Sequence, residues 1–228
     1  MAGSPSNFRQ NEPEQLTLID AENEPDLFGF DSAIRSECGV VCGIDEAGRG
    51  PLAGDVFAAA VIFDEGVFVE GINDSKKLTE KKREALFDEI ISKARAYCIA
   101  SASVEEIERL NILQADFLAM ERAYSGLDVK AGIVLVDGNQ LPALDAQMRY
   151  VIKGDAKSAS IAAASILAKV SRDRYMKQMA EKYPQYGFEK HKGYGTKAHY
   201  AAVDEFGLCE IHRKSFFMKY FEKREKHG

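Results

Sequence analysis

The chain has 228 residues, of which 46% are hydrophobic and 29% charged, and its formal net charge is −6. These values are those of a soluble globular protein with one α/β domain of ordinary size. The longest apolar stretch, residues 57–63, is far too short to cross a bilayer, and the first residues lack a basic segment followed by an apolar one. We therefore expect a cytoplasmic protein with no membrane partner, and we expect it to act as a monomer.

The charges are distributed unevenly along the chain. Residues 1–37 and 38–146 carry net charges of −6 and −8, whereas residues 147–228 carry +8. A local basic region can attract a polyanion even when the whole chain is acidic, so the net charge does not exclude a nucleic-acid partner. A solvated C-terminal surface is the alternative explanation. The four cysteines form no C-x₂-C pair and no regular framework, which indicates reduced cysteines and argues against zinc.

The N-terminal residues differ in character from the rest. Residues 1–39 are polar and acidic without sustained periodicity, which predicts a flexible arm with one short helical turn near residues 25–28. From residue 40 onward, apolar runs and helical patterns alternate. We therefore expect one ordered domain over residues 40–228.

The first half of this domain is predicted to mix strands and helices. Two apolar segments at 40–45 and 55–63 indicate buried strands joined by a glycine-rich turn. Thr79 is expected to cap a helix whose apolar residues recur every four positions from Leu86. Further strands are predicted at 97–103, 132–138 and 149–155, with helices at 104–110 and 112–127 between the first two of them.

The C-terminal part is predicted to be helical. Its longest helix spans about residues 158–182, and the first half is so rich in Ala and Ser that another element could pack very close to it. A loop rich in glycine and lysine follows at 187–196, and two more helices are expected near 197–206 and 213–224. Strands linked first by a hairpin and later by helices indicate an α/β fold, a mixed sheet flanked by helices with a C-terminal helical region.

Acidic residues stand where the predicted strands end: Asp45 with Glu46, then Asp137, then Asp155. Ligands of open α/β sheets bind outside the carboxyl ends of strands, and converging carboxylates need a compensating cation. Mg²⁺ and Mn²⁺ prefer such oxygen ligands. As alternatives, Asp137 could be a turn residue and Asp155 could cap the following helix. Because neighbouring strand residues point to opposite faces, Asp45 and Glu46 can share a site only if the strand ends or twists between them.

Five motifs follow one another along the chain: "GIDEAGRGPLAG" from Gly43, "NDSKKL" from Asn73, "LVDGN" from Leu135, "KGDAKSASIAAASILAKVSRDR" from Lys153 and "HKGYGT" from His191. Over about residues 40–216 the chain thereby closely resembles the ribonuclease HII family. The resemblance implies an RNase H-like fold and an endonuclease that cuts RNA paired with DNA. It also implies incision on the 5′ side of single ribonucleotides in duplex DNA, leaving 3′-hydroxyl and 5′-phosphate ends.

The resemblance also assigns residues. It implies that Asp45, Glu46, Asp137 and Asp155 are the acidic catalytic set and hold two divalent ions, Mn²⁺ or Mg²⁺. In the two-metal scheme we expect Asp45 to bridge the ions, Glu46 and Asp137 to bind one side and Asp155 the other. The chain departs from the family at Asp55, where proline is more common, and its arm leaves no room for the additional N-terminal domain of ribonuclease HIII.

Substrate-binding residues are expected in the same motifs. Gly48, Arg49 and Gly50 would read the 2′-hydroxyl and hold a phosphate. The resemblance implies that Tyr194 stacks on the sugar past the RNA–DNA junction. The alternatives are an ordinary turn and a buried core tyrosine. Six lysines are expected to contact the phosphates of the nucleic-acid backbone, although each could equally be a solvated surface residue: Lys76 first, then Lys77, Lys153, Lys157, Lys190 and Lys192.

Two other functions and one further partner complete the hypotheses. A non-catalytic nucleic-acid module would lack one of the acids, and a nucleotide-binding P-loop would need G-x-x-x-x-G-K-[ST], which is absent. Within the arm, a glutamine followed by spaced leucines at Gln15–Ile19 resembles the peptides that dock on bacterial sliding clamps. A chance apolar island is the alternative explanation of this segment.

Overall fold

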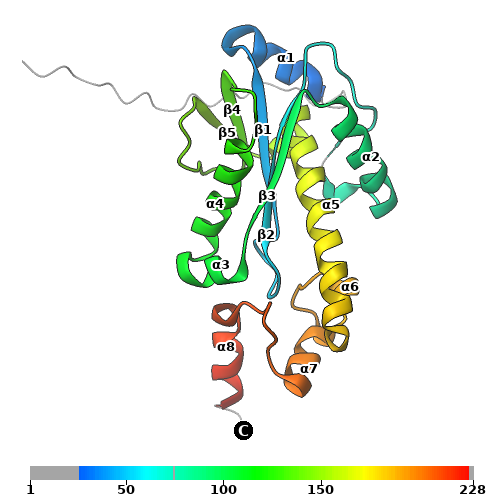
Figure 1. The fold of residues 1–228 in the computed structure, drawn as a ribbon, viewed down its shortest axis with the longest axis vertical. Helices are drawn as coiled ribbons and strands as arrows, with labels where there is room; N and C mark the ends of the chain where they lie inside the picture. Colours follow the sequence, from blue (N-terminus) through cyan, green and yellow to red (C-terminus); the bar gives the residue numbers. More distant parts are fainter. Residues whose placement is uncertain (1–25, 74, 226–228) are drawn as a thin grey trace, which may run out of the picture.

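The computed structural model describes residues 26–73 and 75–225, and its centre is one mixed sheet of five strands (Figure 1). The strand order is β3-β2-β1-β4-β5. β1 pairs antiparallel with β2 and β2 with β3, whereas β1 pairs in parallel with β4 and β4 with β5. The strands span Val41–Ala47 (β1), Val56–Ile62 (β2), Ala96–Ala102 (β3), Ile133–Asp137 (β4) and Met148–Val151 (β5). The predicted hairpin start and the mixed sheet are confirmed.

One face of the sheet is covered by α5 (Ala159–Lys182), the longest helix. Ser158 caps it by accepting a hydrogen bond from the Ile161 N–H, and its small residues let β1 approach closely. A Cβ on Gly43 would lie 2.2 Å from the backbone of Ser160, so only glycine permits this contact. The predicted Ala- and Ser-rich face is therefore the surface on which the sheet rests.

The remaining helices complete two layers around the sheet. α2 (Glu80–Lys93) lies beside α5 and is capped by Thr79, as predicted. The opposite face is covered by α4 (Ile112–Ser125), which follows α3 (Val104–Leu110). Within the described residues, no helix has the length and apolarity that crossing a membrane requires.

The ordered domain begins earlier than predicted. Where the sequence predicts an arm as far as residue 39, α1 spans Leu27–Cys38 and is capped by Asp26. Its buried residues Leu27 and Ile34 pack into the core, and Asp31 accepts a hydrogen bond from the Ser160 N–H at the start of α5. This helix is stabilised by tertiary contacts with residues far along the chain, which could not be predicted from its own short sequence. The predicted clamp peptide at Gln15–Ile19 lies outside the described residues.

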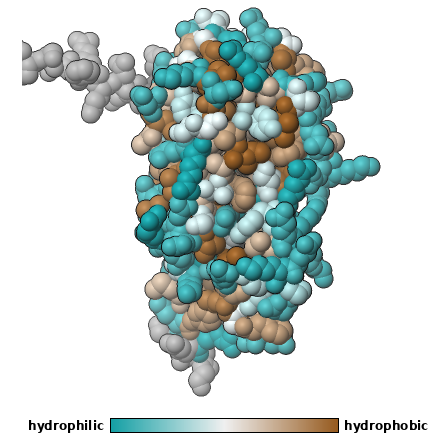
Figure 2. All heavy atoms as spheres, in the orientation of Figure 1, coloured by the Kyte–Doolittle hydropathy of each residue, from teal (hydrophilic) through white to brown (hydrophobic). Residues whose placement is uncertain are grey.

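The C-terminal helices form a lobe below the sheet with a separate hydrophobic cluster around Phe188 and Phe217 (Figure 1). It comprises α6 (Phe188–His191), α7 (Lys197–Phe206) and α8 (Lys214–Glu225) together with the lower end of α5. The short α6 lies inside the segment predicted to be a loop. In the view of Figure 2, hydrophilic side chains surround an apolar middle, and a second apolar group appears at the lower end.

Candidate active site

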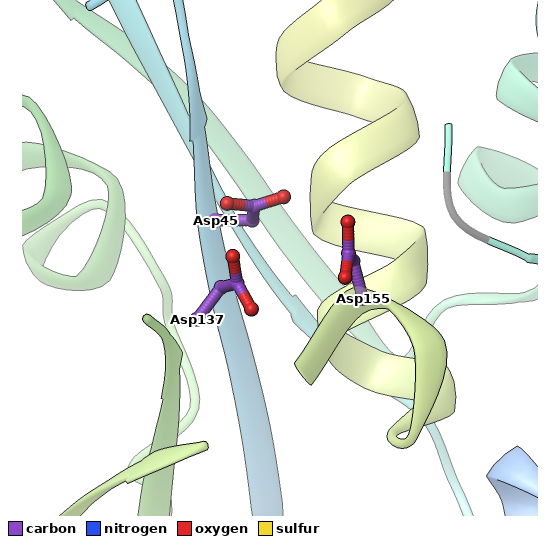
Figure 3. Close-up of side chains that lie close together, drawn as sticks. All are labelled: Asp45, Asp137 and Asp155. Carbon is purple, nitrogen blue, oxygen red and sulfur yellow. The ribbon is translucent and has the colours of Figure 1, made fainter. Parts of the chain in front are cut away.

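Three aspartates from separate segments meet beside α5 (Figure 3). Asp45 belongs to β1, Asp137 is the last residue of β4, and Asp155 lies in a 3₁₀ turn at Gly154–Ala156. One carboxylate oxygen of each lies within 4.8 Å of those of the other two. Parallel pairing of β1 with β4 brings the first two together, since they directly follow the paired residues Ile44 and Val136.

The site differs from the prediction at Asp155. The strand expected to end at Asp155 stops at Val151, and the chain then turns to carry this carboxylate to the cluster. Gly154 lies close against α5 in this turn, since a Cβ there would be 2.6 Å from the Ile161 side chain. Its N–H donates a hydrogen bond of 2.6 Å to Asp137 Oδ1, so the same residue orients a second member of the cluster.

The electrostatics of the cluster are those of a cation site. Burial, followed by the charges of Glu46 and Asp137, raises the pKa of Asp45 well above its usual range. Lys76 Nζ lies 3.3 Å from Asp155 Oδ2, but the lysine side chain is 77% exposed, which weakens its compensation by screening. A donor set made only of carboxylate oxygens fits a hard divalent ion such as Mg²⁺ or Mn²⁺. Among the described residues this is the one such group of candidate ligands.

Glu46 stands outside this cluster. β1 continues in regular register, with Asp45 opposite Ala59 and Glu46 opposite Ala58, so the strand does not end between these two residues. The Glu46 side chain lines the cavity but faces Arg49, whose Nη1 lies 3.7 Å from Glu46 Oε1. Burial raises the pKa of Glu46, and Arg49 opposes that rise.

The predicted substrate residues converge on the same cavity, which measures about 220 Å³. Its lining includes Asp45, Glu46, Asp137, Gly48, Arg49, Gly50, Lys76 and Tyr194. Tyr194 is 47% exposed and its ring lies over Gly50, where a Cβ would be 3.7 Å from the ring edge. A buried core tyrosine is thereby excluded. Four of the other lysines proposed to contact phosphates do not line the cavity, namely Lys153, Lys157, Lys190 and Lys192, and the side chain of Lys77 lies outside the described part of the structure.

The glycine-rich loop that carries Arg49 is held by two buried arginines that sequence reasoning missed. Arg213, fully buried, donates hydrogen bonds to the carbonyl oxygens of Gly48, Arg49, Pro51 and Gly54. Arg172, 1% exposed, donates to the carbonyl oxygens of Ala53, Asp55 and Lys192. A Cβ on Gly48 would lie 2.2 Å from Arg172 Nε, and φ of Gly48 is +109°, so this position requires glycine.

Three other residues of the site and its surroundings went unpredicted. Ser165 and Lys169 line the cavity from α5, Ser165 within its buried N-terminal segment and Lys169 directly after that segment. Their spacing of four on one helix face was the available signal.

Asp55, the departure from the family pattern, accepts a hydrogen bond from the Val104 N–H at the start of α3. Its side chain therefore serves the scaffold and leaves the cluster unaffected.

Comparisons with known proteins identify the family of this chain. The family model of ribonuclease HII matches residues 42–219. Ribonuclease HII of Delftia acidovorans is 62% identical over 178 residues, which are 78% of this chain and 76% of the relative. The crystal structure of ribonuclease H2 from Pyrococcus horikoshii OT3 has a TM-score of 0.69 and 27% identity, covering 83% of this chain and 100% of that chain.

A second structure, the PCNA:RNase HII complex from Archaeoglobus fulgidus, has a TM-score of 0.60 and 26% identity, covering 76% of this chain and 93% of that chain. The family model covers the cavity, its carboxylate cluster and both buried arginines, and the fold agrees with that of the solved ribonucleases. This chain therefore belongs to the ribonuclease HII family, and it is an endoribonuclease that acts on RNA–DNA hybrids.

Proposed function

We propose that this enzyme incises duplex DNA on the 5′ side of a single embedded ribonucleotide, in addition to cutting longer RNA–DNA hybrids. The products would carry 3′-hydroxyl and 5′-phosphate ends, so that DNA repair can remove ribonucleotides left by replication. One observation carries this proposal: the glycine-rich loop, Arg49 and Tyr194 line the same cavity as Asp45 and Asp137. A sugar bound against the loop and the ring would therefore lie beside the acidic cluster.

The acidic residues would hold two divalent ions, Mg²⁺ or Mn²⁺. In this assignment Asp45 would serve both ions, Glu46 and Asp137 would serve one, and Asp155 would serve the other. Ions held in this way activate a water molecule and stabilise the leaving 3′-oxygen of a phosphodiester. The proximity of the Asp45, Asp137 and Asp155 oxygens supports their part of the assignment. Glu46 is included because it lines the same cavity.

Discrimination of RNA from DNA requires contact with the 2′-hydroxyl. The loop at Gly48 and Gly50 offers backbone without a Cβ, so a sugar can approach it closely. Arg49 is partly exposed beside the loop and can bind an adjacent phosphate through its planar guanidinium. Tyr194 presents an exposed ring on which the next sugar can stack. These three features favour the junction between RNA and DNA over a uniform hybrid.

The test is an incision assay on a 5′-labelled duplex that contains one ribonucleotide, with Mn²⁺, with Mg²⁺ and with EDTA. We expect one product that ends on the 5′ side of the ribonucleotide with a 3′-hydroxyl, which a polymerase can extend. The all-DNA duplex should remain intact, and an all-RNA hybrid should be cut at several positions. Cleavage of the hybrid without incision of the single-ribonucleotide duplex would refute the proposal. Binding without any cleavage would indicate the non-catalytic alternative.

We also propose that Gln15–Ile19 binds a sliding clamp. The complex of RNase HII with PCNA from Archaeoglobus fulgidus supports a clamp as partner of such an enzyme. Full-length protein should bind the clamp of its own organism in surface plasmon resonance, and replacement of Gln15 and Leu18 by alanine should abolish binding. Incision of free oligonucleotides should not change in that variant. Equal binding by both proteins would exclude this segment, and no binding by either would exclude the partner.

A further inference from the structure

Asp116 of α4 is a buried carboxylate that the proposed function leaves unexplained. The residue is fully buried, and neither side-chain oxygen has a hydrogen-bond partner among the described residues. It lies in an otherwise apolar helix face whose neighbours include Ala115, Ala119 and Met120. A buried carboxylate without hydrogen bonds destabilises the folded state, so its presence calls for a reason beyond packing.

Asp116 forms an ion pair with Arg49 of the glycine-rich loop. Arg49 Nε lies 3.5 Å from Asp116 Oδ2, and Arg49 Nη1 lies 3.7 Å from Glu46 Oε1. The two carboxylates differ in position, because Glu46 lines the cavity whereas Asp116 does not. The guanidinium is thus held from the core side by one acid, while 46% of the Arg49 side chain remains exposed.

The charge environment agrees with this contact. Burial and then the nearby Glu46 raise the pKa of Asp116 to about 8, and Arg49 is the group that opposes the rise. The ionised carboxylate of Asp116 is therefore stabilised by Arg49. No main-chain N–H donates to it, so any movement of Arg49 away from Asp116 would leave the charge buried without compensation. The buried charge of Asp116 therefore favours the position of the Arg49 guanidinium in which the two groups are paired.

We infer that Asp116 is a positioning residue that fixes the Arg49 guanidinium at the edge of the cavity, where it can hold a phosphate of the nucleic-acid backbone. The inference rests on the proposed role of Arg49 and goes beyond it by naming the group that orients it. An unrestrained arginine would lose side-chain freedom on binding each phosphate, whereas a restrained one has already lost it. Substrate affinity is therefore the property that depends on Asp116.

The experiment is a double-mutant cycle with Asp116→Asn, Arg49→Gln and the double variant, performed at pH 8.5 so that Asp116 is ionised. The readouts are the Kd for the single-ribonucleotide duplex in EDTA, KM and kcat in Mg²⁺, and the midpoint of thermal unfolding. Asp116→Leu serves as a second variant of similar volume. Asp31→Asn is the matched control, since Asp31 is also buried but accepts a hydrogen bond from the Ser160 N–H and has no contact with Arg49.

We expect Asp116→Asn to raise Kd and KM about three- to tenfold, the scale of one phosphate contact, with kcat changed less than twofold. The midpoint of unfolding should rise, because a buried charge that accepts no hydrogen bond has been replaced by a neutral side chain. In the Arg49→Gln background the same substitution should have no further effect on Kd. Asp31→Asn should leave Kd unchanged.

Three results would overturn the inference: an unchanged Kd, effects of Asp116→Asn and Arg49→Gln that simply add, or a weaker Kd that accompanies a lower unfolding midpoint. The Kd cycle needs no cleavage. A wild-type enzyme that binds the duplex but does not incise it would therefore refute the proposed function while the cycle still decides the role of Asp116.

Discussion

The acidic site and the C-terminal lobe both bury charged groups, but the two regions balance these charges differently. Asp45, Asp137 and Asp155 bring like charges together, and the largely exposed Lys76 pairs with Asp155. In the lobe, Arg213 is fully buried and forms no ion pair among the described residues, but it donates five hydrogen bonds to backbone carbonyl groups. The acidic site therefore concentrates negative charge, whereas the lobe surrounds its buried cation with acceptors.

The loop at residues 48–55 joins these two regions. Its carbonyl groups accept the hydrogen bonds of Arg213 and Arg172, while Gly48, Arg49 and Gly50 line the cavity. The two buried arginines therefore determine the shape of the loop beside the acidic site. Substitutions in the acidic site should lower the cleavage rate without lowering the stability of the fold. Substitutions in the lobe should lower the stability first, and they should weaken substrate recognition because the loop then loses its shape.

The largest effect is expected for Asp45→Asn. The substitution removes a charge from the cluster with almost no change in volume, so incision should fall by roughly 10³-fold or more, as expected when a two-ion site is lost. The thermal midpoint should rise, because like charges no longer repel one another. Rates with Mn²⁺ and calorimetric unfolding check both parts. Substantial turnover at saturating Mn²⁺ would contradict the assignment of Asp45, and a lower midpoint would contradict the electrostatic contrast.

The second prediction addresses the lobe. Arg213→Met keeps much of the volume but leaves the carbonyl groups of Gly48, Arg49, Pro51 and Gly54 without their donor. Removing a buried charged donor of this kind is expected to lower the free energy of unfolding by about 3–5 kcal/mol, and incision should fall by roughly 10²-fold as the loop loses its shape.

Arg213→Lys is the control for charge without the planar fork, and it should lose stability less than Arg213→Met does. Urea unfolding and incision of the single-ribonucleotide duplex are the measurements. If Arg213→Met kept full stability, the hydrogen bonds of Arg213 to the backbone carbonyl groups would not be what stabilises the loop and the lobe.

The third prediction concerns Tyr194, which lies between the two regions. Loss of its exposed ring should lower incision at a lone ribonucleotide by about one to two decades, the equivalent of roughly 1–3 kcal/mol for aromatic stacking. Tyr194→Phe should lose less than Tyr194→Ala, and cleavage of all-RNA hybrids should suffer least. Equal losses on both substrates, or a collapse of the unfolding midpoint, would show that this tyrosine supports the fold and does not recognise the junction.

The sequence predicted the acidic site better than its supports. Asp45, Asp137 and Asp155 were found because acids that follow apolar strands are unusual and their positions match a family motif. Arg172 and Arg213 were missed because arginine is normally a surface residue, and no local pattern marks one that is buried against carbonyl groups.

Helix α1 was missed for a related reason. Its apolar residues Leu27, Phe30 and Ile34 recur at helical spacing over only two turns. The contacts of Leu27, Asp31 and Ile34 that stabilise the helix are made with residues far along the chain. Glu46 shows the opposite limit. The two-residue period of a strand correctly indicated that neighbours such as Asp45 and Glu46 point to different faces if the strand continues through both. Whether it continues could not be read from the sequence, and the register of β1 with β2 shows that it does.

The smallest effect is expected for a pair of histidines behind Tyr194. The Cys209 N–H donates to His212 Nδ1 at 2.8 Å, so the proton of this neutral ring is on Nε2. That N–H donates to His199 Nε2 at 3.0 Å, which leaves His199 Nδ1–H to donate to the Tyr194 carbonyl at 3.0 Å. A further proton on His199 Nε2 would face the His212 N–H, and one on His212 Nδ1 would face the Cys209 N–H. Burial lowers the pKa of both histidines to about 4.

Because the folded pKa lies below the unfolded value of about 6.5, the unfolded chain binds more protons between pH 4 and pH 6.5. The stability that the neutral pair contributes is therefore complete above pH 6.5 and is lost as the pH falls toward 4, with about 1–2 kcal/mol lost at pH 5.5 for the first proton. Asp45 and Asp116, whose pKa values are raised, act in the opposite direction. Subtracting the urea-unfolding curves of a His199→Asn, His212→Gln variant from those of the wild type isolates the histidines. A difference that stays constant from pH 7.5 to pH 5 would show that this pair does not hold the Tyr194 loop through its neutral tautomers.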